Sequence, residues 1–260
     1  MFPYVEIFGI TIGTYSIWGV IGLIIAGTLA CYLGKDIGLF CEDISLAVIV
    51  LAVGIMLGGH TLYALTNIRD ILNMLFETPY ITFAQMVKKI TSCFDGMVYY
   101  GGFIGAFIFL SVFCRIFYPN KKEKMSDIFS VCVPLFHCFA RIGCFFAGCC
   151  FGIESKIGFI TNTNNLIPEI NGVIRIPIQL IEACINLFVF VVLYSLTFKK
   201  HKDGTLIYVY ILLYAPMRFV LEFFRGDLHR GIWWHWSTSQ WISVLLISVA
   251  IIKYIKNKKW

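Results

Sequence analysis

Residues 44–65 read ISLAVIVLAVGIMLGGHTLYAL, a stretch without a single Asp, Glu, Lys or Arg. A helix needs about 20 mostly apolar residues to cross the hydrocarbon core of a membrane, and this stretch is long enough. Its glycines, Gly54, Gly58 and Gly59, are small residues of the kind that let two helices approach closely in lipid. The stretch therefore predicts a membrane-spanning helix that packs closely against another helix.

The same apolar pattern recurs along the chain. Apolar residues make up 59% of the 260 residues and charged residues 14%, whereas soluble proteins have about 45–50% and 25%. We therefore predict an all-α fold, a polytopic membrane helix bundle with about seven transmembrane helices, forming a single integral membrane domain over residues 1–260. The first apolar stretch lacks a basic n-region and an evident cleavage site, so we expect a retained span there. The predicted spans lie near residues 13–33, 44–65, 97–118, 127–147, 178–198, 206–224 and 240–256.

Basic residues predict the orientation, because Lys and Arg are more frequent in cytoplasmic loops. With the N-terminus outside, twelve basic residues fall in inner segments and seven in outer ones, while Arg141 and Arg218 lie within spans. We therefore predict an N-out, C-in orientation. The outer connections, near 66–96, 148–177 and 225–239, are longer than the inner ones, and we expect the chemistry to open to that side. The net charge of +6 belongs to these short clusters, so no nucleic-acid partner is expected.

Charged residues within spans are candidates for function, because they cost several kcal/mol in lipid unless they are paired or face a cavity. In residues 216–225, PMRFVLEFFR, the charges of Arg218, Glu222 and Arg225 fall on one helical stripe. An internal salt-bridge ladder is one explanation, but two Arg against one Glu leave a surplus positive charge. A guanidinium is a natural partner of phosphate, so the stripe favours a role in binding a phosphate group.

Two further clusters lie in the fourth and fifth predicted spans. Arg141 follows His137 by one turn on the same face, and Gly143 indicates close approach of the backbone to a neighbouring helix or a ligand. Gln179 and Glu182 share a face at i, i+3. Glu182 either neutralises one of the two arginines within spans or takes part in catalysis, and the residues alone leave both readings open.

The third predicted span opens with Tyr99, Tyr100, Gly101 and Gly102. Tyrosines at this depth commonly anchor a helix at the membrane interface. A tyrosine followed by two glycines is also a way to present a phenol beside exposed backbone amides. Both interpretations of the segment stand.

Together these segments resemble the prolipoprotein diacylglyceryl transferase family. Any one block is weak evidence, but their occurrence in the family's order over nearly the whole chain is specific. The blocks are ITIGTY at 10–15, Gly-Gly at 101–102, Arg-Ile-Gly at 141–143, PIQLIE at 177–182, RFVLEFFR at 218–225 and Ser-Gln at 239–240.

The resemblance implies an enzyme of the bacterial cytoplasmic (inner) membrane. Such an enzyme moves the diacylglyceryl group of phosphatidylglycerol onto the thiol of a lipobox cysteine in a prolipoprotein and releases glycerol phosphate. Its partners would be phosphatidylglycerol, the prolipoprotein signal segment and the lipid bilayer, and we expect a monomer without metal or cofactor. Arg141 and Arg218 could stabilise the charge that develops on the phosphate, while a base would help to activate the attacking thiol.

Three positions depart from the family's pattern. Tyr100 stands where the family has histidine, Cys144 where it has asparagine, and Cys149 where it has glutamate. The chain thus keeps the expected phosphate-binding groups and lacks the family's candidate acid and base. Carried over by motif position, we expect catalytic roles for Arg141, Arg218, Tyr100, His137, Glu182 and Cys149, and substrate binding by Tyr15, Gly101, Gly102, Gly143, Cys144, Gln179, Glu222 and Arg225.

Two explanations for the departures compete. Tyr100 or His137 handles the proton in the same reaction, although a tyrosine with its ordinary pKa of about 10 is a poor base. Alternatively, the chain is a paralogue that serves another acceptor or uses a thiol of its own, with Cys149 as nucleophile or redox switch. The spacing of Cys144, Cys149 and Cys150 lacks the separated pairs of a zinc site, so no metal is predicted.

Two non-enzymatic alternatives complete the set of hypotheses. A lipid or anion transporter of this size is expected to show an internal repeat, and none is visible in the sequence. A non-catalytic membrane protein that binds lipid or signal segments is compatible with the same residues.

Overall fold

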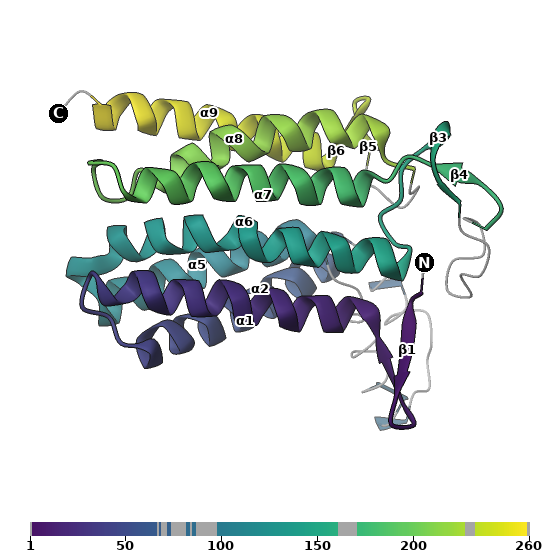
Figure 1. The fold of residues 1–260 in the computed structure, drawn as a ribbon, viewed down its shortest axis with the longest axis horizontal. Coiled ribbons are helices and arrows are strands. Elements are labelled where there is room, and N and C mark those ends of the chain that lie inside the picture. Colours follow the sequence, from purple (N-terminus) through teal and green to yellow (C-terminus); the bar gives the residue numbers. More distant parts are fainter. Residues whose placement is uncertain are drawn as a thin grey trace. The chain divides into compact units, whose positions relative to one another are not determined.

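The computed structural model describes residues 2–66, 98–160, 171–226 and 232–258, with seven isolated positions between Ile68 and Met86. The described residues are mostly helical (Figure 1). In the described residues, the short 3-10 helices η1 (Pro119–Lys121) and η3 (Glu222–Phe224) accompany the α-helices. The α-helices of the described part are α1 (Thr14–Lys35), α2 (Cys41–Thr66), α5 (Tyr99–Phe117), α6 (Lys122–Ala147), α7 (Ile178–Thr197), α8 (Leu206–Leu221) and α9 (Thr238–Lys258).

The helices coincide with the predicted spans to within a few residues. Five segments of the described chain are long and apolar enough to cross a membrane: Thr14–Lys35, Cys41–Thr66, Pro119–Ala147, Ile178–Thr197 and Leu206–Phe224. The apolar parts of α5 and α9, Gly101–Phe117 and Thr238–Lys253, are shorter. The polytopic helical fold is therefore confirmed, while the number of seven spans and the orientation stay predictions.

The described part of the chain contains three antiparallel strand pairs that were not predicted. β1 (Tyr4–Ile7) pairs with β2 (Ile10–Gly13), β3 (Glu154–Ile160) with β4 (Ile174–Arg175), and β5 (Ile232–Trp233) with β6 (Trp236–Ser237). Phe8 and Gly9 form the first turn with φ of 52° and 77°, as a two-residue hairpin of this twist requires. A Phe-Gly turn lacks the usual Asn-Gly signal, which is why hydropathy alone does not reveal it.

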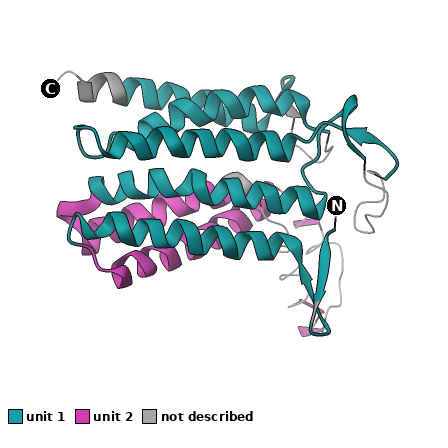
Figure 2. Cartoon of the chain, viewed as in Figure 1, with its two compact units in different colours: residues 1–38, 123–260 teal, residues 39–122 magenta. Residues whose placement is uncertain are grey.

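The chain forms two compact units, residues 1–38 with 123–260 and residues 39–122 (Figure 2). In the second unit, α2 and α5 meet backbone to backbone through Gly54, Gly58, Gly101 and Gly105. A Cβ added to Gly58 would overlap the carbonyl oxygen of Gly101. The close helix approach predicted from the glycines of residues 44–65 is therefore confirmed for Gly54 and Gly58.

Polar contacts secure the other end of this helix pair. The Tyr118 hydroxyl, just beyond α5, donates a hydrogen bond of 2.5 Å to Asp43 Oδ1 in the first turn of α2. This hydrogen bond to a carboxylate raises the pKa of Tyr118 to about 12. Asp43 Oδ2 also accepts the backbone N–H of Phe40 at 2.8 Å, which satisfies a donor ahead of α2.

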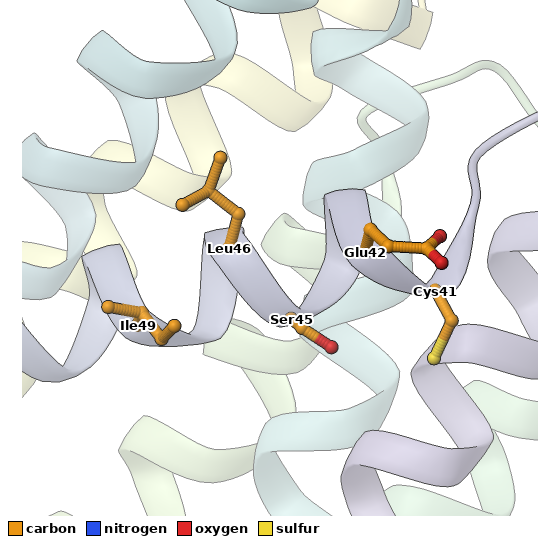
Figure 3. Close-up of a pocket in the computed structure, with 5 residues that line it drawn as sticks. All are labelled: Cys41, Glu42, Ser45, Leu46 and Ile49. Carbon is orange, nitrogen blue, oxygen red and sulfur yellow. The ribbon is translucent and has the colours of Figure 1, made fainter.

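An open hollow lies along the first turns of α2. Its volume is about 440 Å³, and it is lined by Cys41, Glu42, Ser45, Leu46 and Ile49. Figure 3 shows these side chains on successive turns of the helix. Leu46 and Ile49 are exposed apolar residues, which is usual for a helix face that contacts lipid.

In the first unit, α6 is the most buried helix. In its apolar part 72% of the residues are buried, compared with 22–33% in the other span-length helices of the described chain. α1 packs on it where Gly22 lies against Phe139. Val131 of α6 joins Val189, Leu193 and Leu206 in an apolar core with Tyr210. α6 carries His137, Arg141 and Cys144 of the site described below.

The connections of this unit meet at its two ends. At one end, Asp127 of α6 accepts the backbone N–H groups of Gly204 and Leu206 at 2.7 and 2.8 Å. At the other end, Gly143 contacts Tyr15, and Gly152 pairs with Arg225. The N-terminus and the predicted outer connections 148–177 and 225–239 thus share an end wherever they are described. Most of the outer connection 66–96 lies outside the described residues.

We expect Gly58→Ala to destabilise the chain. Alanine is the better helix former by about 1 kcal/mol, but its methyl group overlaps the carbonyl of Gly101, and overpacking of this kind costs about 1–3 kcal/mol. The thermal unfolding midpoint of the purified protein in detergent should fall. Gly19→Ala on α1 is the matched control, since its Cβ meets nothing within 4 Å. A midpoint for Gly58→Ala equal to that of Gly19→Ala would contradict the packing described.

Candidate active site

A buried carboxylate lies at the centre of the polar groups in the first unit. Glu182 of α7 is 1% exposed. Its Oε1 lies 3.0 Å from Nη2 of Arg141 on α6 and accepts a hydrogen bond of 3.0 Å from the Tyr214 hydroxyl of α8. His137 Nε2 lies 4.0 Å from the same oxygen. Of the two expectations for Glu182, neutralisation of Arg141 is thus confirmed, and a catalytic part stays a prediction.

Arg141 and His137 share one face of α6, as the spacing predicted, and they are also hydrogen-bonded to each other. Arg141 Nε donates a hydrogen bond of 3.2 Å to His137 Nε2. A guanidinium can only donate, so His137 accepts at Nε2 and is neutral, with its proton on Nδ1. Both side chains are buried, so Arg141 is fixed on one side by the histidine and on another by Glu182.

Arg218 forms the second buried ion pair, one turn from the end of α8. Its Nη2 lies 2.6 Å from Oε2 of Glu222 and 3.3 Å from the Ser239 hydroxyl of α9. Its Nη1 is buried and has no hydrogen-bond partner among the described residues. Unpaired buried donors are rare and costly, so this N–H group is suited to a bound anion.

The predicted stripe of Arg218, Glu222 and Arg225 holds for the first two residues and is wrong for the third. α8 ends at Leu221, Glu222 begins the tighter η3, and Arg225 has extended backbone with ψ of 137°. Arg225 then pairs with Gly152 as an antiparallel bridge. This bridge to a neighbouring loop overrides the helical continuation that the spacing predicted.

A sharp turn follows α6 and gathers three thiols. Gly148, with φ of 79°, donates its N–H to the carbonyl of Cys144 at 3.0 Å, and Cys150 also has a left-handed φ of 56°. The sulfur atoms of Cys144, Cys149 and Cys150 consequently lie within 4.8 Å of one another. Gln179 Nε2 donates to the carbonyl of Cys149 at 2.8 Å and holds the turn against α7.

The thiols of this turn differ in acidity. Hydrogen bonds with Cys144 and Cys149, together with the nearby guanidiniums of Arg141 and Arg225, lower the pKa of Cys150 below its usual value. Hydrogen bonds with Cys144 and Cys150, together with burial, raise the pKa of Cys149. Cys150 is therefore favoured over Cys149 as the more acidic thiol of this turn.

An apolar cavity lies where the start of α1 meets the end of α6. Gly143 of α6 lies against the backbone of Tyr15 at the start of α1, where an added Cβ would be 3.3 Å from the Tyr15 carbonyl oxygen. The half-exposed Tyr15 side chain is within electrostatic reach of Arg141 and the three thiols. Beside it lies a cavity of about 290 Å³ lined by Phe2, Val5, Thr14, Ile17, Trp18, Ile21 and Phe146.

The first unit thus contains eleven of the fourteen predicted site residues: Tyr15, His137, Arg141, Gly143, Cys144, Cys149, Gln179, Glu182, Arg218, Glu222 and Arg225. Tyr100, Gly101 and Gly102 belong to the first turn of α5 in the second unit. Gly101 packs against α2, and the Tyr100 side chain lies outside the described part of the structure. The functional roles of these three residues stay predictions.

Sequence reasoning assigned no role to Tyr214 or Ser239, although both contact the central charges. Tyr214 lies one turn before Arg218 on α8, so the helical spacing that linked Arg218 to Glu222 could have found it. Ser239 belongs to the Ser-Gln block at 239–240, but no feature of the sequence marked its side chain as part of the site. Only the folded chain brings α9 to Arg218.

A helical membrane protein whose interior holds two arginines, two glutamates and a histidine has the features of a membrane-embedded enzyme. Comparison with known proteins agrees. Residues 3–256 match the family model of prolipoprotein diacylglyceryl transferase. The chain therefore belongs to the prolipoprotein diacylglyceryl transferase family, which makes it a transferase and a multi-pass inner-membrane protein.

Curated relatives match over nearly their whole length. Phosphatidylglycerol–prolipoprotein diacylglyceryl transferase of Clostridium tetani is 30% identical, covering 96% of this chain and 94% of the relative. The Campylobacter jejuni enzyme of the same name, from strain 81-176, is 32% identical, covering 96% and 91%. A second clostridial protein, from Clostridium perfringens, is 29% identical, covering 97% and 94%.

Glu182→Gln should destabilise the protein strongly. The substitution leaves the Arg141 guanidinium buried without its counter-charge, and breaking one partner of a buried pair costs about 3–5 kcal/mol. Thermal or denaturant unfolding in detergent measures the loss.

Glu154→Gln is the matched control, since Glu154 is 69% exposed in its pair with Arg175 and such pairs contribute at most about 1 kcal/mol. The double variant Arg141→Gln/Glu182→Gln should recover part of the lost stability. Equal stability of Glu182→Gln and Glu154→Gln would show that Glu182 is not the counter-charge of Arg141.

Proposed function

We propose that this chain transfers the diacylglyceryl group of phosphatidylglycerol to the lipobox cysteine thiol of prolipoproteins and releases glycerol phosphate. The names of the relatives supply both substrates. The observation that carries the proposal is the buried Nη1 group of Arg218, which has no hydrogen-bond partner among the described residues. A phosphate oxygen is the ligand that such a donor fits best.

The phosphate is held, in this proposal, by Arg141 and Arg218. Glu182 binds Nη2 of Arg141, and Glu222 binds Nη2 of Arg218. These contacts orient both guanidiniums but do not use all of their N–H groups. The leaving phosphate gains negative charge as the bond to the diacylglyceryl group breaks. Fixed donors in a water-poor site stabilise that charge far better than water does.

The apolar parts of the donor need a separate place. The cavity beside Tyr15 is lined by apolar side chains of α1, α6 and the first hairpin, and Trp18 and Phe146 stack there with ring centroids 5.7 Å apart. This cavity is suited to part of an acyl chain. The headgroup would then lie toward Arg141, which is within electrostatic reach of Tyr15.

The attacking thiol must lose its proton. His137 uses its Nε2 lone pair for the N–H of Arg141 in the structure described here. A phosphate that accepts the hydrogen bond of Arg141 Nε would free His137 Nε2. Binding of the phospholipid would thereby prepare His137 as the base. Tyr100 stays the other candidate for this step, and Cys149 stays a candidate nucleophile or redox switch. Gln179 Oε1 is buried and has no hydrogen-bond partner among the described residues, so it could accept a hydrogen bond from the substrate.

We propose seven spans with the N-terminus outside and the site opening to the outer face. The clustering of the N-terminal hairpin, residues 148–160 and Arg225 at one end of the first unit supports this arrangement. Lys124, Asp203 and Gly204 gather at the opposite end, as expected of cytoplasmic connections.

A paralogue that serves another acceptor is the second candidate function. The three-thiol turn favours it, because Cys144 and Cys149 replace the asparagine and glutamate that the family resemblance implies at these positions. The two functions differ only in what receives the diacylglyceryl group.

Labelled phosphatidylglycerol and a lipobox peptide distinguish the candidates. With purified protein, release of glycerol phosphate together with label on the peptide thiol is the result we expect. Release without peptide labelling would favour another acceptor. An absence of release from the folded wild-type protein would overturn both enzymatic functions and leave lipid or signal-segment binding.

Arg218→Lys is the sharpest test of the phosphate role. A lysine can keep the ion pair with Glu222 and hence the fold, but it lacks the second N–H group that Nη1 supplies. We expect turnover to fall about 100-fold or more, as on loss of an oxyanion donor, with an unchanged unfolding midpoint. Arg115→Lys, at an exposed position of α5, is the matched control. Turnover of Arg218→Lys within a factor of two of the control would refute the assignment.

A further inference from the structure

The turn after α6 holds three soft ligands that the proposed transfer reaction does not need as a set. The sulfur atoms of Cys144, Cys149 and Cys150 all lie within 4.8 Å of one another, and none of the three is in a disulfide. Cys144 is buried, while the other two are half-buried. Spacing along the sequence did not predict a metal site here, because a reversal of the chain by Gly148 and Cys150 creates the cluster.

The separation of the sulfurs fits a metal ion closely. With a metal–sulfur bond of about 2.3 Å, the sulfurs of a trigonal site lie about 4.0 Å apart. The sulfurs lie at most 4.8 Å apart, so side-chain shifts of less than about 1 Å would bring them to this separation. Gln179 fixes the backbone of the turn through a hydrogen bond of 2.8 Å to the carbonyl of Cys149.

The number and kind of ligands select the metal. In the described part of the chain, no histidine, aspartate or glutamate joins the three thiols as a fourth ligand. Structural zinc sites almost always have four ligands, whereas all-thiolate sites select soft ions such as Cu(I). A three-coordinate Cu(I) site agrees with both observations.

Neighbouring charges complement such a complex. One Cu(I) with three thiolates carries a charge of about −2 by simple counting of ionic charges. Arg141 and Arg225 both act electrostatically on Cys150, and Arg141 also acts on Cys144. The guanidinium of Arg225, and in part that of Arg141, which also pairs with Glu182, therefore favour the negative charge of the occupied site.

We propose that Cys144, Cys149 and Cys150 form a binding site for Cu(I) in the turn that follows α6. Binding forms three Cu–S bonds and releases to solvent the protons of those thiols that are still protonated. No atom changes oxidation state, so the step needs no oxidant or reductant. The proposal is independent of the transfer reaction, and its test measures metal binding alone.

The test uses the full chain, purified in detergent under anaerobic and reducing conditions. Cu(I) is titrated in competition with bicinchoninate, a coloured chelator of this ion. We expect one Cu(I) per chain to resist the chelator, and Cys150→Ser to weaken its retention by at least about tenfold. Cys184→Ser is the matched control, since Cys184 is an exposed cysteine outside the cluster and should retain Cu(I) as the wild type does.

X-ray absorption at the copper edge of the wild-type protein provides a readout that does not depend on the folding of variants. Three sulfur neighbours at about 2.3 Å support the site. Fewer than three sulfurs, or equal Cu(I) retention by wild type and folded Cys150→Ser, would overturn it. Displacement of Cu(I) by Zn(II) in a four-ligand complex would likewise overturn the three-coordinate assignment.

Discussion

The rest of the first unit depends on the interaction between Glu182 and the positive charges around it. A carboxylate that is 1% exposed among apolar helices is stable only with a partner. Arg141 and Tyr214 provide partners from α6 and α8 at 3.0 Å each. Three helices are thereby required to meet at one point. Lipid offers little driving force for helix association, so this polar contact complements the apolar packing of the same helices.

The way in which the charges are paired also decides what they can bind. Arg141, Arg218, Glu182 and Glu222 balance one another in charge, so the buried set is stable without a ligand. The hydrogen bonds of these groups are nevertheless incomplete, because Arg218 Nη1 has no hydrogen-bond partner in the described part of the chain. Charge neutrality therefore accounts for the fold, while the remaining N–H group is the feature that favours an anionic ligand. Arg225, outside the helix, adds positive charge at the edge of the site.

Hydropathy and spacing along helices could predict the spans, the pairing of Arg141 with His137, and that of Arg218 with Glu222. These contacts are local, and one helical period determines them. The hairpin at Phe8 and Gly9, the departure of Arg225 toward Gly152 and the contact of Arg218 with Ser239 could not be predicted in this way. Each depends on a backbone reversal or a partner distant in sequence. The thiol cluster belongs to the same class, since left-handed backbone at Gly148 and Cys150 creates it.

The turn after α6 also explains how the chain can depart from its family's pattern without losing the arginine. Gln179 contacts the backbone carbonyl of Cys149 and not its side chain, while Gly148 ends the helix through its own N–H. The path of the turn therefore does not require a glutamate at position 149. Arg141 is held separately by His137 and Glu182, both on regular helices. Because these supports are independent, the residue type in the turn can change while the position of Arg141 is kept.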